Sequence, residues 1–332
     1  MADLEGKTLL VTGANGFVGR HLLTALGERN TAHLHATRLG TVTDVNPQQG
    51  EQIIHWHALD ITDRQQTASL IAAIRPHVVF HLAAQSHIPT SFADPALTWQ
   101  VNLHGTLNLL TALQATCPAA TIIHVGSSDM YGAGFHDVAP VTEQTPLMPL
   151  NPYAASKAAA DLAAFQFSAT SSLKVIRARP FNHSGPGQDR GFVLPSFAAQ
   201  IAEIERGLLQ PTLKVGDLSA ERDFLHVADV VDAYITMAVH ADRIESGAAF
   251  NIASGTPTSI QSLLDRFLQA SNCNISTQTD PARLRPTDIL RVCGDSRLLQ
   301  ATTGWQPKRS LATLVNDLLN YWRAQVATVP AT

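Results

Sequence analysis

Charged residues are scarce in this chain, and cysteines are scarcer. Only 15% of its 332 residues are charged, against roughly a quarter in an average soluble protein. The 23 Lys and Arg residues are outnumbered by 27 Asp and Glu residues, so the basic excess that a nucleic-acid partner requires is missing. A hydrophobic content of 45% excludes a disordered chain. Cys117, Cys273 and Cys293 are odd in number and show no metal-ligand spacing, so we expect no disulfide framework.

Long apolar runs are missing as well. No stretch approaches the roughly 20 apolar residues of a membrane-spanning helix, and the opening MADLEGKTLLVTGANG lacks the basic-then-apolar layout of a signal peptide. The 14 histidines, among them His33, His35, His55 and His57, are scattered without acidic or cysteine neighbours at ligand spacing. We therefore expect a cytoplasmic protein with no membrane partner, no nucleic-acid partner and no metal ion.

The first half of the chain alternates strand-like apolar runs with helical stretches. Helices are expected near 17–29, from Thr62 or Asp63 onward, and near 94–116. Strands apolar on both faces and separated by helices are typical of a parallel sheet covered on each side. This pattern predicts a Rossmann-type, doubly wound α/β domain. The expected strands are 7–12, 32–38, 53–59, 77–83, 121–127 and 173–179.

The alternation weakens after Pro180. The stretch from Pro140 to Pro152 reads as a loop, because each proline removes a backbone donor. A helix near 192–206 and a short strand at 213–216 follow, and then a helix at 226–241 and a strand at 248–253 return to the first sheet. The predicted division is a sheet domain of residues 1–179 with 225–253, and a smaller discontinuous α/β lobe of residues 180–224 and 254–332.

The segment TGANGFVG stands directly between a strand and a helix. Gly13 permits a tight turn, Gly16 lets the backbone approach a pyrophosphate, and Gly19 permits close helix packing, with the phosphates at the positive end of the helix. At the end of the second strand an acidic residue would bind the ribose 2′-hydroxyl of NAD, whereas an arginine suits the 2′-phosphate of NADP. The chain has Arg38 there and no carboxylate until Asp44, which favours NADP(H).

Tyr153 and Lys157 are four residues apart in YAASKAAADLAAF, so they share one helix face. A free phenol, with a pKa of about 10, is a poor acid or base at neutral pH; a neighbouring ammonium and a positive nicotinamide bring it toward the useful range. Ser127 follows the strand-like run TIIHVGS, at the strand end where ligands bind in such sheets. Its hydroxyl can hold a substrate oxygen beside Tyr153; the alternative for Ser127 is a helix cap or turn.

These motifs resemble the nucleotide-sugar branch of the extended short-chain dehydrogenases/reductases, whose glycine spacing is the GxxGxxG seen here. AAQSHIPTSF, RPFNHSGPGQ, VGDLSAERDFLHVADVVDA and RLRPTDI are most similar to the group of GDP-mannose 4,6-dehydratases and GDP-4-keto-6-deoxy-mannose reductases. The resemblance covers almost the whole chain.

The resemblance implies further site residues. Asn102 matches a helix-embedded asparagine that holds the lysine through water, although a structural polar contact explains it nearly as well. Cofactor contacts are implied for Asn15, Phe17, Val18, Asp60, Ile61, Leu82, Ala83, Ala84, Pro180 and His183, with Phe181 near the nicotinamide. Substrate contacts are implied for Gln85, Ser86, Ser128, Asn182, Val193, Gly216, Arg222 and Arg285, with Asp217 and Leu218 near the base. Arginine forks at Arg222 and Arg285 suit a diphosphate, and surface ion pairs are the alternative.

Which reaction is catalysed depends on Asp129. Dehydratases of this branch carry a Glu at this place to abstract a sugar proton, and Asp withdraws the carboxylate by roughly an ångström, which can cost about a hundredfold in rate. HSGPGQ also resembles the reductase loop. We therefore predict NADPH-dependent reduction of the 4-keto group of a GDP-6-deoxyhexose, giving GDP-rhamnose or its 4-epimer. The alternative is a GDP-mannose 4,6-dehydratase with Asp129 as base, or another nucleotide-sugar dehydratase or epimerase. A non-catalytic NADP(H)-binding regulator is a remote alternative.

The helix that carries Tyr153 has few charges on any face. Small side chains permit close helix approach, and one sheet cannot cover all sides of such a helix. In the family this helix and the long one before it form a four-helix dimer contact. A homodimer through the helices near 94–116 and 153–169 is therefore predicted.

Overall fold

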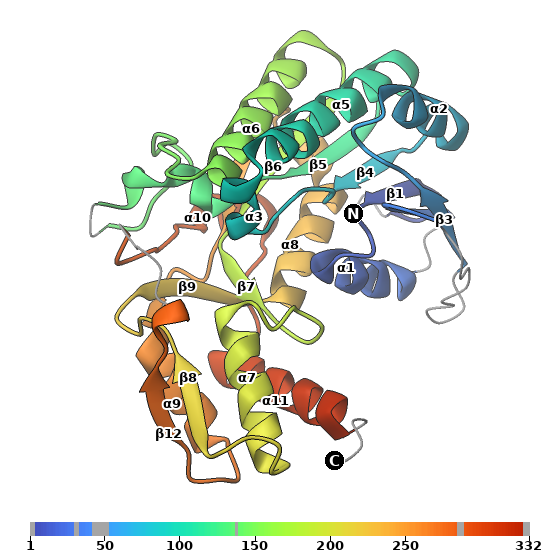
Figure 1. Cartoon of the computed structure of the whole chain (residues 1–332). Coiled ribbons are helices and arrows are strands. Elements are labelled where there is room, and N and C mark those ends of the chain that lie inside the picture. Colours follow the sequence, from blue (N-terminus) through green and yellow to red (C-terminus); the bar gives the residue numbers. More distant parts are fainter. Residues whose placement is uncertain (1–3, 30–32, 42–52, 137–138, 284–288, 328–332) are drawn as a thin grey trace.

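The computed structural model describes residues 4–29, 33–41, 53–136, 139–283 and 289–327. The chain forms a large sheet domain and a smaller lobe, with the C-terminal helix in the lobe (Figure 1). Among the described residues, seven parallel strands form the main sheet in the order β10-β6-β5-β4-β1-β2-β3. The bounds are β1 Thr8–Thr12, β2 His33–Arg38, β3 Ile54–Ala58, β4 Val78–His81, β5 Thr121–Val125, β6 Lys174–Pro180 and β10 Ala249–Ile252.

Helices cover both faces of this sheet, as Figure 1 shows. Alternate residues of each buried strand face opposite layers: Leu9 and Ile123 pack toward one helix layer, and Leu10 and Ile122 pack toward the other. Each fully buried aliphatic side chain contributes about 1.5–3 kcal/mol. The predicted doubly wound α/β class is confirmed. One layer contains α1 (Phe17–Gly27) and α8 (Val227–Val239), and the other contains α2 (Arg64–Ile74), α5 (Gly105–Thr116) and α6 (Pro152–Thr170).

The long helix expected near 94–116 is continuous but irregular. It consists of α4 (Pro95–Trp99), one π-helical turn η1 (Gln100–His104) and α5, and a shorter helix α3 (Ile88–Ala93) precedes it. The carboxylate of Asp94 caps α4 by accepting from the Leu97 amide at 2.9 Å. Single π-turns inside helices are frequent at functional sites, and this one contains Asn102.

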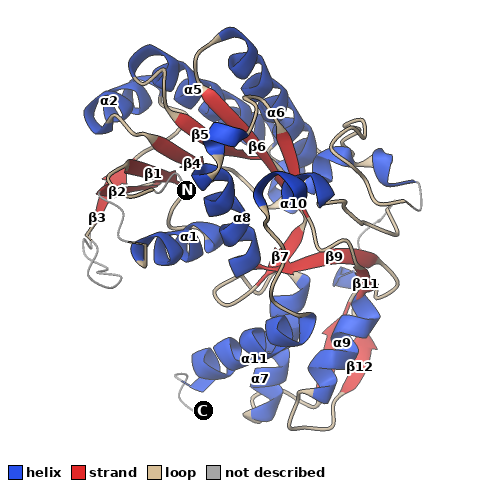
Figure 2. Cartoon of the chain, turned by 180° about the vertical axis from the view of Figure 1, so that it is seen from behind, coloured by secondary structure: helices blue, strands red, loops and turns tan. Residues whose placement is uncertain are grey.

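The smaller lobe has a separate apolar core between three helices (Figure 2). These helices are α7 (Val193–Glu205), α9 (Ile260–Gln269) and α11 (Leu311–Ala327), beside the paired strands β8 (Thr212–Val215) and β12 (Ser276–Thr279). A small sheet of β7 (Asn182–Ser184), β9 (Glu221–His226) and β11 (Pro257–Ser259) lies between this lobe and the main sheet domain (Figure 2). The remaining elements are α10 (Arg297–Thr303) and the short 3₁₀ turns η2 (Ser128–Tyr131), η3 (Ala133–His136), η4 (Ala241–Arg243) and η5 (Pro281–Arg283).

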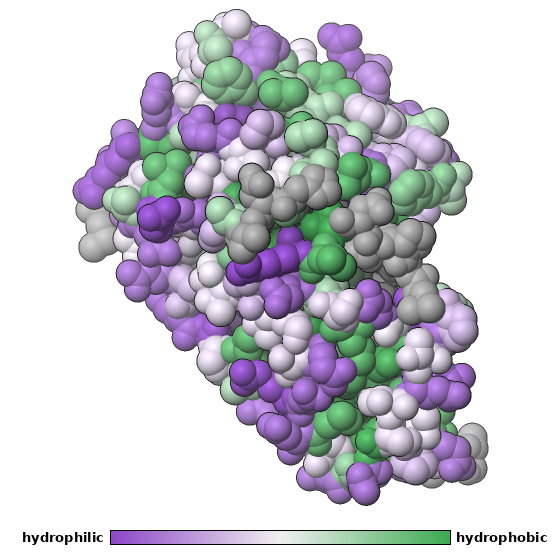
Figure 3. Space-filling view, turned by 90° about the vertical axis from the view of Figure 1, so that its left-hand side faces the viewer, coloured by the Kyte–Doolittle hydropathy of each residue, from purple (hydrophilic) through white to green (hydrophobic). Residues whose placement is uncertain are grey.

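The predicted return to the first sheet is visible in the structure. β10 pairs in parallel with β6 at the edge of the main sheet, and α8 packs against α1 beneath it. No helix among the described residues is long and apolar enough to cross a membrane. On the side shown in Figure 3, hydrophilic and hydrophobic residues are interspersed.

Candidate active site

The turn after β1 is built by two glycines that tolerate no side chain. Gly13 has φ +66°, and a Cβ added there would lie 2.8 Å from the backbone of Ala83, at the end of β4. A Cβ at Gly19 would lie 2.6 Å from the Gly13 carbonyl oxygen. Gly16 is the N-cap of α1 and supplies no capping side chain, so the first amides of the helix are available to an anion. This cradle fits a dinucleotide pyrophosphate.

Arg38 ends β2, beside this turn. Its buried Nε has no hydrogen-bond partner, and an unpaired buried donor requires an explanation. A 2′-phosphate would supply the missing acceptor, so the residues present fit NADP(H). Asp60 and Ile61 follow β3 nearby, where the Asp60 carboxylate accepts from the Thr62 amide and hydroxyl at 2.9 and 2.7 Å and so fixes the turn.

The other predicted cofactor residues come together from distant segments. Phe17 of α1 stacks on His183 of β7, with ring centroids 6.2 Å apart. The imidazole of His183 is held by the Phe181 carbonyl oxygen at 2.8 Å. His21, which the sequence analysis did not single out, packs edge-on against Phe17 and bonds the Pro186 carbonyl oxygen. Asn15 contributes its carbonyl oxygen, which accepts from Arg20. The remaining predicted contacts lie on or beside three elements. Val18 is in α1, Leu82 and Ala84 follow β4, and Pro180 ends β6.

Ser127 and Tyr153 meet at the carboxyl end of β5. The Ser127 hydroxyl caps η2 by accepting from the Asp129 amide at 3.2 Å, so the capping role considered from sequence is real. It also interacts with the Tyr153 phenol and acts to lower its pKa. Burial and the charge of Asp129 raise the pKa of Tyr153 above its ordinary value, and the bond to Ser127 opposes them. One hydroxyl therefore organises both the turn and the phenol.

Lys157 lies buried one helical turn beyond Tyr153. Its Nζ donates to the Val125 carbonyl oxygen, the last of β5, at 2.6 Å. Burial lowers the pKa of Lys157 to about 8, and the nearby Asp161 carboxylate offsets part of this effect. Asn102 does not reach toward this ammonium: its amide donates to Gln85 and Ser156 and accepts from the Gln85 amide. In this structure Asn102 therefore joins its helix to Gln85 and to Ser156 of α6.

The smaller lobe reaches the site through Arg222 of β9. Burial raises the pKa of the Asp129 carboxyl, while the positive charge of Arg222 opposes this shift. Arg222 donates to the carbonyl oxygens of Glu221 and Ile289 at 2.8 and 3.1 Å, so backbone contacts rather than a surface ion pair hold its guanidinium. Asp129 and Arg222 therefore face each other across the two parts of the molecule.

The other predicted substrate residues are spread over both parts. Gln85 is engaged with Thr98 and the His87 amide, and Gly216 packs against the Arg283 backbone within the lobe. Asp217 is engaged in the same way, because its carboxylate accepts from Ser219. Arg285 lies outside the described residues. Ser86 is exposed, Ser128 is buried in η2, Asn182 begins β7, Val193 begins α7, and Leu218 packs against the core of the lobe.

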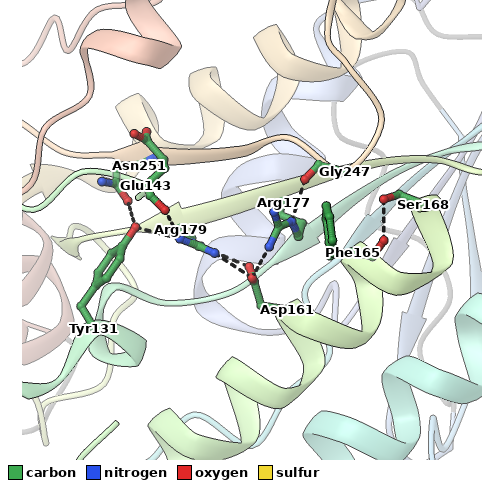
Figure 4. A network of polar contacts seen from close by, with 9 residues as sticks. All are labelled: Tyr131, Glu143, Asp161, Phe165, Ser168, Arg177, Arg179, Gly247 and Asn251. Atoms are coloured by element: carbon green, nitrogen blue, oxygen red, sulfur yellow. Dashed lines mark hydrogen bonds and ion pairs between the residues drawn. The ribbon is translucent and has the colours of Figure 1, made fainter. Parts of the chain in front are cut away.

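A buried polar network behind the catalytic helix was missed from sequence (Figure 4). Asp161 accepts from Arg177 at 2.5 Å and from Arg179 at 2.8 and 3.3 Å. Arg179 continues to the Tyr131 hydroxyl at 3.0 Å, which donates to Asn251. The available signals were the single acidic residue in an alanine-rich helix, four residues after Lys157, and the alternating arginines of the strand VIRARP.

Three of the histidines that are scattered in the sequence come together in space. His35 Nδ1 lies 2.9 Å from His57 Nε2, and the rings of His55 and His57 both stack on His35. These side chains come from the neighbouring strands β2 and β3, whose register aligns them. Within the described ranges, no group of three or more His, Cys, Asp or Glu side chains is arranged to hold a metal ion.

Comparison with known proteins shows which family the chain belongs to. The sequence model of the GDP-mannose 4,6 dehydratase family matches residues 10–318. The chain belongs to this family. It is 37% identical over 320 residues to the GDP-6-deoxy-D-mannose reductase of Pseudomonas aeruginosa, covering 96% of this chain and 98% of the relative. It is 30% identical to a UDP-glucose 4-epimerase of Mycolicibacterium smegmatis, covering 95% and 98%.

A solved structure of RMD from Pseudomonas aeruginosa complexed with NADPH superposes on this fold with a TM-score of 0.81. That alignment has 36% sequence identity and covers 96% of this chain and 99% of the other. The resemblance to the nucleotide-sugar branch of the extended short-chain dehydrogenases/reductases is thereby confirmed.

Proposed function

We propose that the protein is an NADPH-dependent reductase that converts the 4-keto group of GDP-4-keto-6-deoxy-D-mannose to a hydroxyl group. The observation that carries this proposal is the Ser127–Tyr153 pair beside Lys157. It stands in a chain that is 37% identical to a GDP-6-deoxy-D-mannose reductase along nearly its whole length. The NADPH in the structure of the similar RMD supports the choice of cofactor, as does the unpaired Nε of Arg38.

The residues divide the work as follows. NADPH supplies the hydride that reduces carbon 4 of the sugar. Tyr153 donates its phenolic proton to the carbonyl oxygen, so one carbon–hydrogen and one oxygen–hydrogen bond form while the carbonyl double bond is lost. Ser127 donates a hydrogen bond to the same oxygen as charge develops on it. Lys157 binds the nicotinamide ribose and lowers the cost of the tyrosinate that remains.

The cofactor and the nucleotide are held at opposite sides of this phenol. The glycine cradle at Gly13, Gly16 and Gly19 receives the pyrophosphate of NADPH, and Arg38 receives its 2′-phosphate. Arg222 binds the diphosphate of the GDP-sugar, with Arg285 proposed as its second arginine. The domain division proposed from sequence assigns residues 1–179 with 225–253 to the cofactor, and residues 180–224 and 254–332 to the nucleotide sugar.

Asp129 favours reduction over dehydration. Its side chain is one methylene shorter than that of glutamate, so its carboxylate reaches less far toward a sugar proton, and the positive charge of Arg222 works against its basicity. The 4,6-dehydratase remains the second candidate because the matching family model carries that activity in its name. We also propose that the protein works in the cytoplasm as a homodimer.

A spectrophotometric assay separates the two reactions. With GDP-4-keto-6-deoxy-D-mannose, the purified protein should oxidise NADPH mole for mole with the sugar, and with GDP-mannose alone the 340 nm absorbance should stay constant. Conversion of GDP-mannose to the 4-keto sugar without net nicotinamide consumption would establish the dehydratase instead. Binding of NADPH without turnover of either sugar would favour a non-catalytic regulator.

A further inference from the structure

Asp161 belongs to the catalytic helix α6 and is buried there in contact with two arginines. Its side chain has no exposed area, and its oxygens lie 2.5 Å from Arg177 Nη1 and 2.8 Å from Arg179 Nη2. Figure 4 shows both guanidinium groups pointing at this one carboxylate from β6. Buried charge pairs with such bidentate geometry are rigid as well as strong. Asp161 is therefore fixed in place by its partners.

The same helix face carries the catalytic pair. Tyr153, Lys157 and Asp161 follow one another at intervals of four residues, which stacks them along one side of α6. The carboxylate lies one turn behind the Lys157 ammonium, which is itself almost fully buried and donates to Val125. The negative charge of Asp161 therefore acts on Lys157 through the protein interior, where solvent screens it little.

Charged groups of both signs lie on the elements packed around Lys157. The groups that face it from α6 are Tyr153 and Asp161, and η2 contributes Asp129. His124 of β5 and His81 of β4 are buried, and burial lowers their pKa, so both are neutral. β6 contributes Arg177 and Arg179. Among the described residues of α3, α4, η1 and α5, which also pack against α6, the titratable side chain is the exposed His104.

We propose that Asp161 is a positioning residue for this reaction, whose carboxylate keeps the buried Lys157 ammonium protonated while the Val125 carbonyl oxygen holds it at the end of β5. The proposal rests on the proposed function, because it assumes that the charged lysine supports cofactor binding and proton transfer. Arg177 and Arg179 hold the carboxylate, and Arg179 ties it through Tyr131 to Asn251 of β10. The arrangement lets a lysine that is buried from water stay charged at neutral pH.

The direction of the effect follows from the charges. The protonated lysine is the active form, so kcat/KM falls as the pH rises through the pKa of Lys157, which is about 8 in the folded protein. Removing the Asp161 charge takes away the interaction that raises the pKa of Lys157, so this pKa falls further. A charge neighbour of this kind shifts a pKa by about 1–3 units. The alkaline decline of activity then begins at lower pH.

The test compares Asp161→Asn with Asp161→Glu and with Glu143→Gln. Glu143 is a matched control because its carboxylate lies at the far end of the same network, where it accepts from the Asn251 amide. For Asp161→Asn we expect the alkaline limb of kcat/KM to move down by at least about one pH unit, with an activity loss of about tenfold at pH 9. Asp161→Glu should restore most of the profile, and Glu143→Gln should keep it.

NADPH affinity, measured by fluorescence across the same pH range, gives a second readout that needs no sugar. The pH at which NADPH binding weakens should move by the same amount as the pH at which kcat/KM declines. Failure of the proposed function would appear as absent sugar turnover with this NADPH profile intact. Failure of the present proposal would appear as an unshifted profile in folded Asp161→Asn, or as an equal shift in Glu143→Gln.

Arg177→Gln covers the case in which Asp161→Asn does not fold. This substitution removes one of the two cations paired with Asp161 and leaves the carboxylate, so less of the negative charge is compensated and the alkaline limb should move to higher pH. A shift to lower pH, or none, in the folded variant would overturn the proposal.

Discussion

Tyr153 holds its proton because of its surroundings. Burial and the Asp129 charge raise the pKa of the phenol, and the bond to Ser127 offsets them only in part. Before ligands bind, the side chain is therefore in the form that a proton donor needs. Tyr153→Phe should reduce kcat by well over about a hundredfold, the range ascribed to a positioned acid, while NADPH still binds. Tyr321→Phe, the same change on α11, should leave kcat unchanged; near-full turnover in Tyr153→Phe would refute the assignment.

The histidine cluster on β2 and β3 makes stability depend on pH. Burial and the charges of His57, His55 and His33 lower the pKa of His35 to about 4, below the roughly 6.5 of an unfolded histidine. Between these values the unfolded chain binds a proton that the native protein does not, so stability is lost as the pH falls from about 6.5 toward 4. Urea unfolding at pH 7 and 4.5 should show this loss, and His35→Gln should lessen it. The exposed His104→Gln should behave like the wild type, and an equal loss in His35→Gln would contradict the argument.

At the scale of single elements, α1 packs close to the turn after β1 because Gly19 has no side chain. A methyl group at position 19 would meet the Gly13 oxygen at 2.6 Å and the Ala14 backbone at 2.7 Å, so the helix would have to move away from the turn. Gly19→Ala should weaken NADPH binding at least about tenfold, because a displacement of this kind misplaces the phosphate-binding amides, and should lower the melting temperature. Thr24→Ala, on the exposed side of α1, serves as the control. Wild-type affinity in Gly19→Ala would show that the close approach is dispensable.

Elements with a strong local pattern were predictable from sequence, and elements that depend on distant partners were not. β1, β4, β5 and β6 are apolar runs buried on both faces, and the return of β10 to their sheet was anticipated. By contrast, β12 is fully exposed and polar and is a strand only because β8 lies beside it. β9 was not predicted from sequence because it begins with the charged residues Glu221 and Arg222. It is defined by its pairing with β7 and β11. α9 was missed although Ser259 caps it and Ile260, Leu263, Leu264 and Phe267 form a regular apolar face.

The same distinction applies to the site. The glycine cradle is carried by spacing within one strand–helix junction, the Tyr153–Lys157 pair by spacing within one helix, and Ser127 by its place at the end of a strand. The Asp161 network joins α6 to β6, Tyr131 and β10, which are up to 120 residues apart in the chain. For Asn102 the helix was predicted from sequence, but its hydrogen-bond partners were not, because they depend on the geometry of the π-helical turn.

For the whole molecule, the proposed nucleotide sugar binds between two parts that have separate cores. A ligand that contacts both parts stabilises both, by about 2.7 kcal/mol at a hundredfold excess over its Kd. In the presence of NADPH, GDP should therefore raise the melting temperature more than UDP, dTDP or CDP at equal concentration. Arg222→Gln should reduce the GDP-dependent shift and leave the NADPH-dependent shift intact. A larger shift with UDP or dTDP would assign the substrate to another nucleotide.

The proposed homodimer is the property of the whole molecule that follows most directly from its surface. Leu162 and Phe165 of α6 are 59% and 48% exposed, and Phe92 and Leu97 on the adjoining α3 and α4 are 62% and 42% exposed. Large apolar side chains gathered on neighbouring helices mark an interaction surface. Leu162, Phe165 and Leu97 lie on the helices predicted to pair, and Phe92 lies on the short helix just before them. The wild type should sediment at twice the chain mass at micromolar concentration. Leu162→Glu places a charge that pairing would bury unpaired, so it should shift the protein to monomer. Leu209→Glu, an equally polar change at an exposed leucine of the smaller lobe, should stay dimeric, and a wild-type protein that sediments as a monomer would remove the proposal.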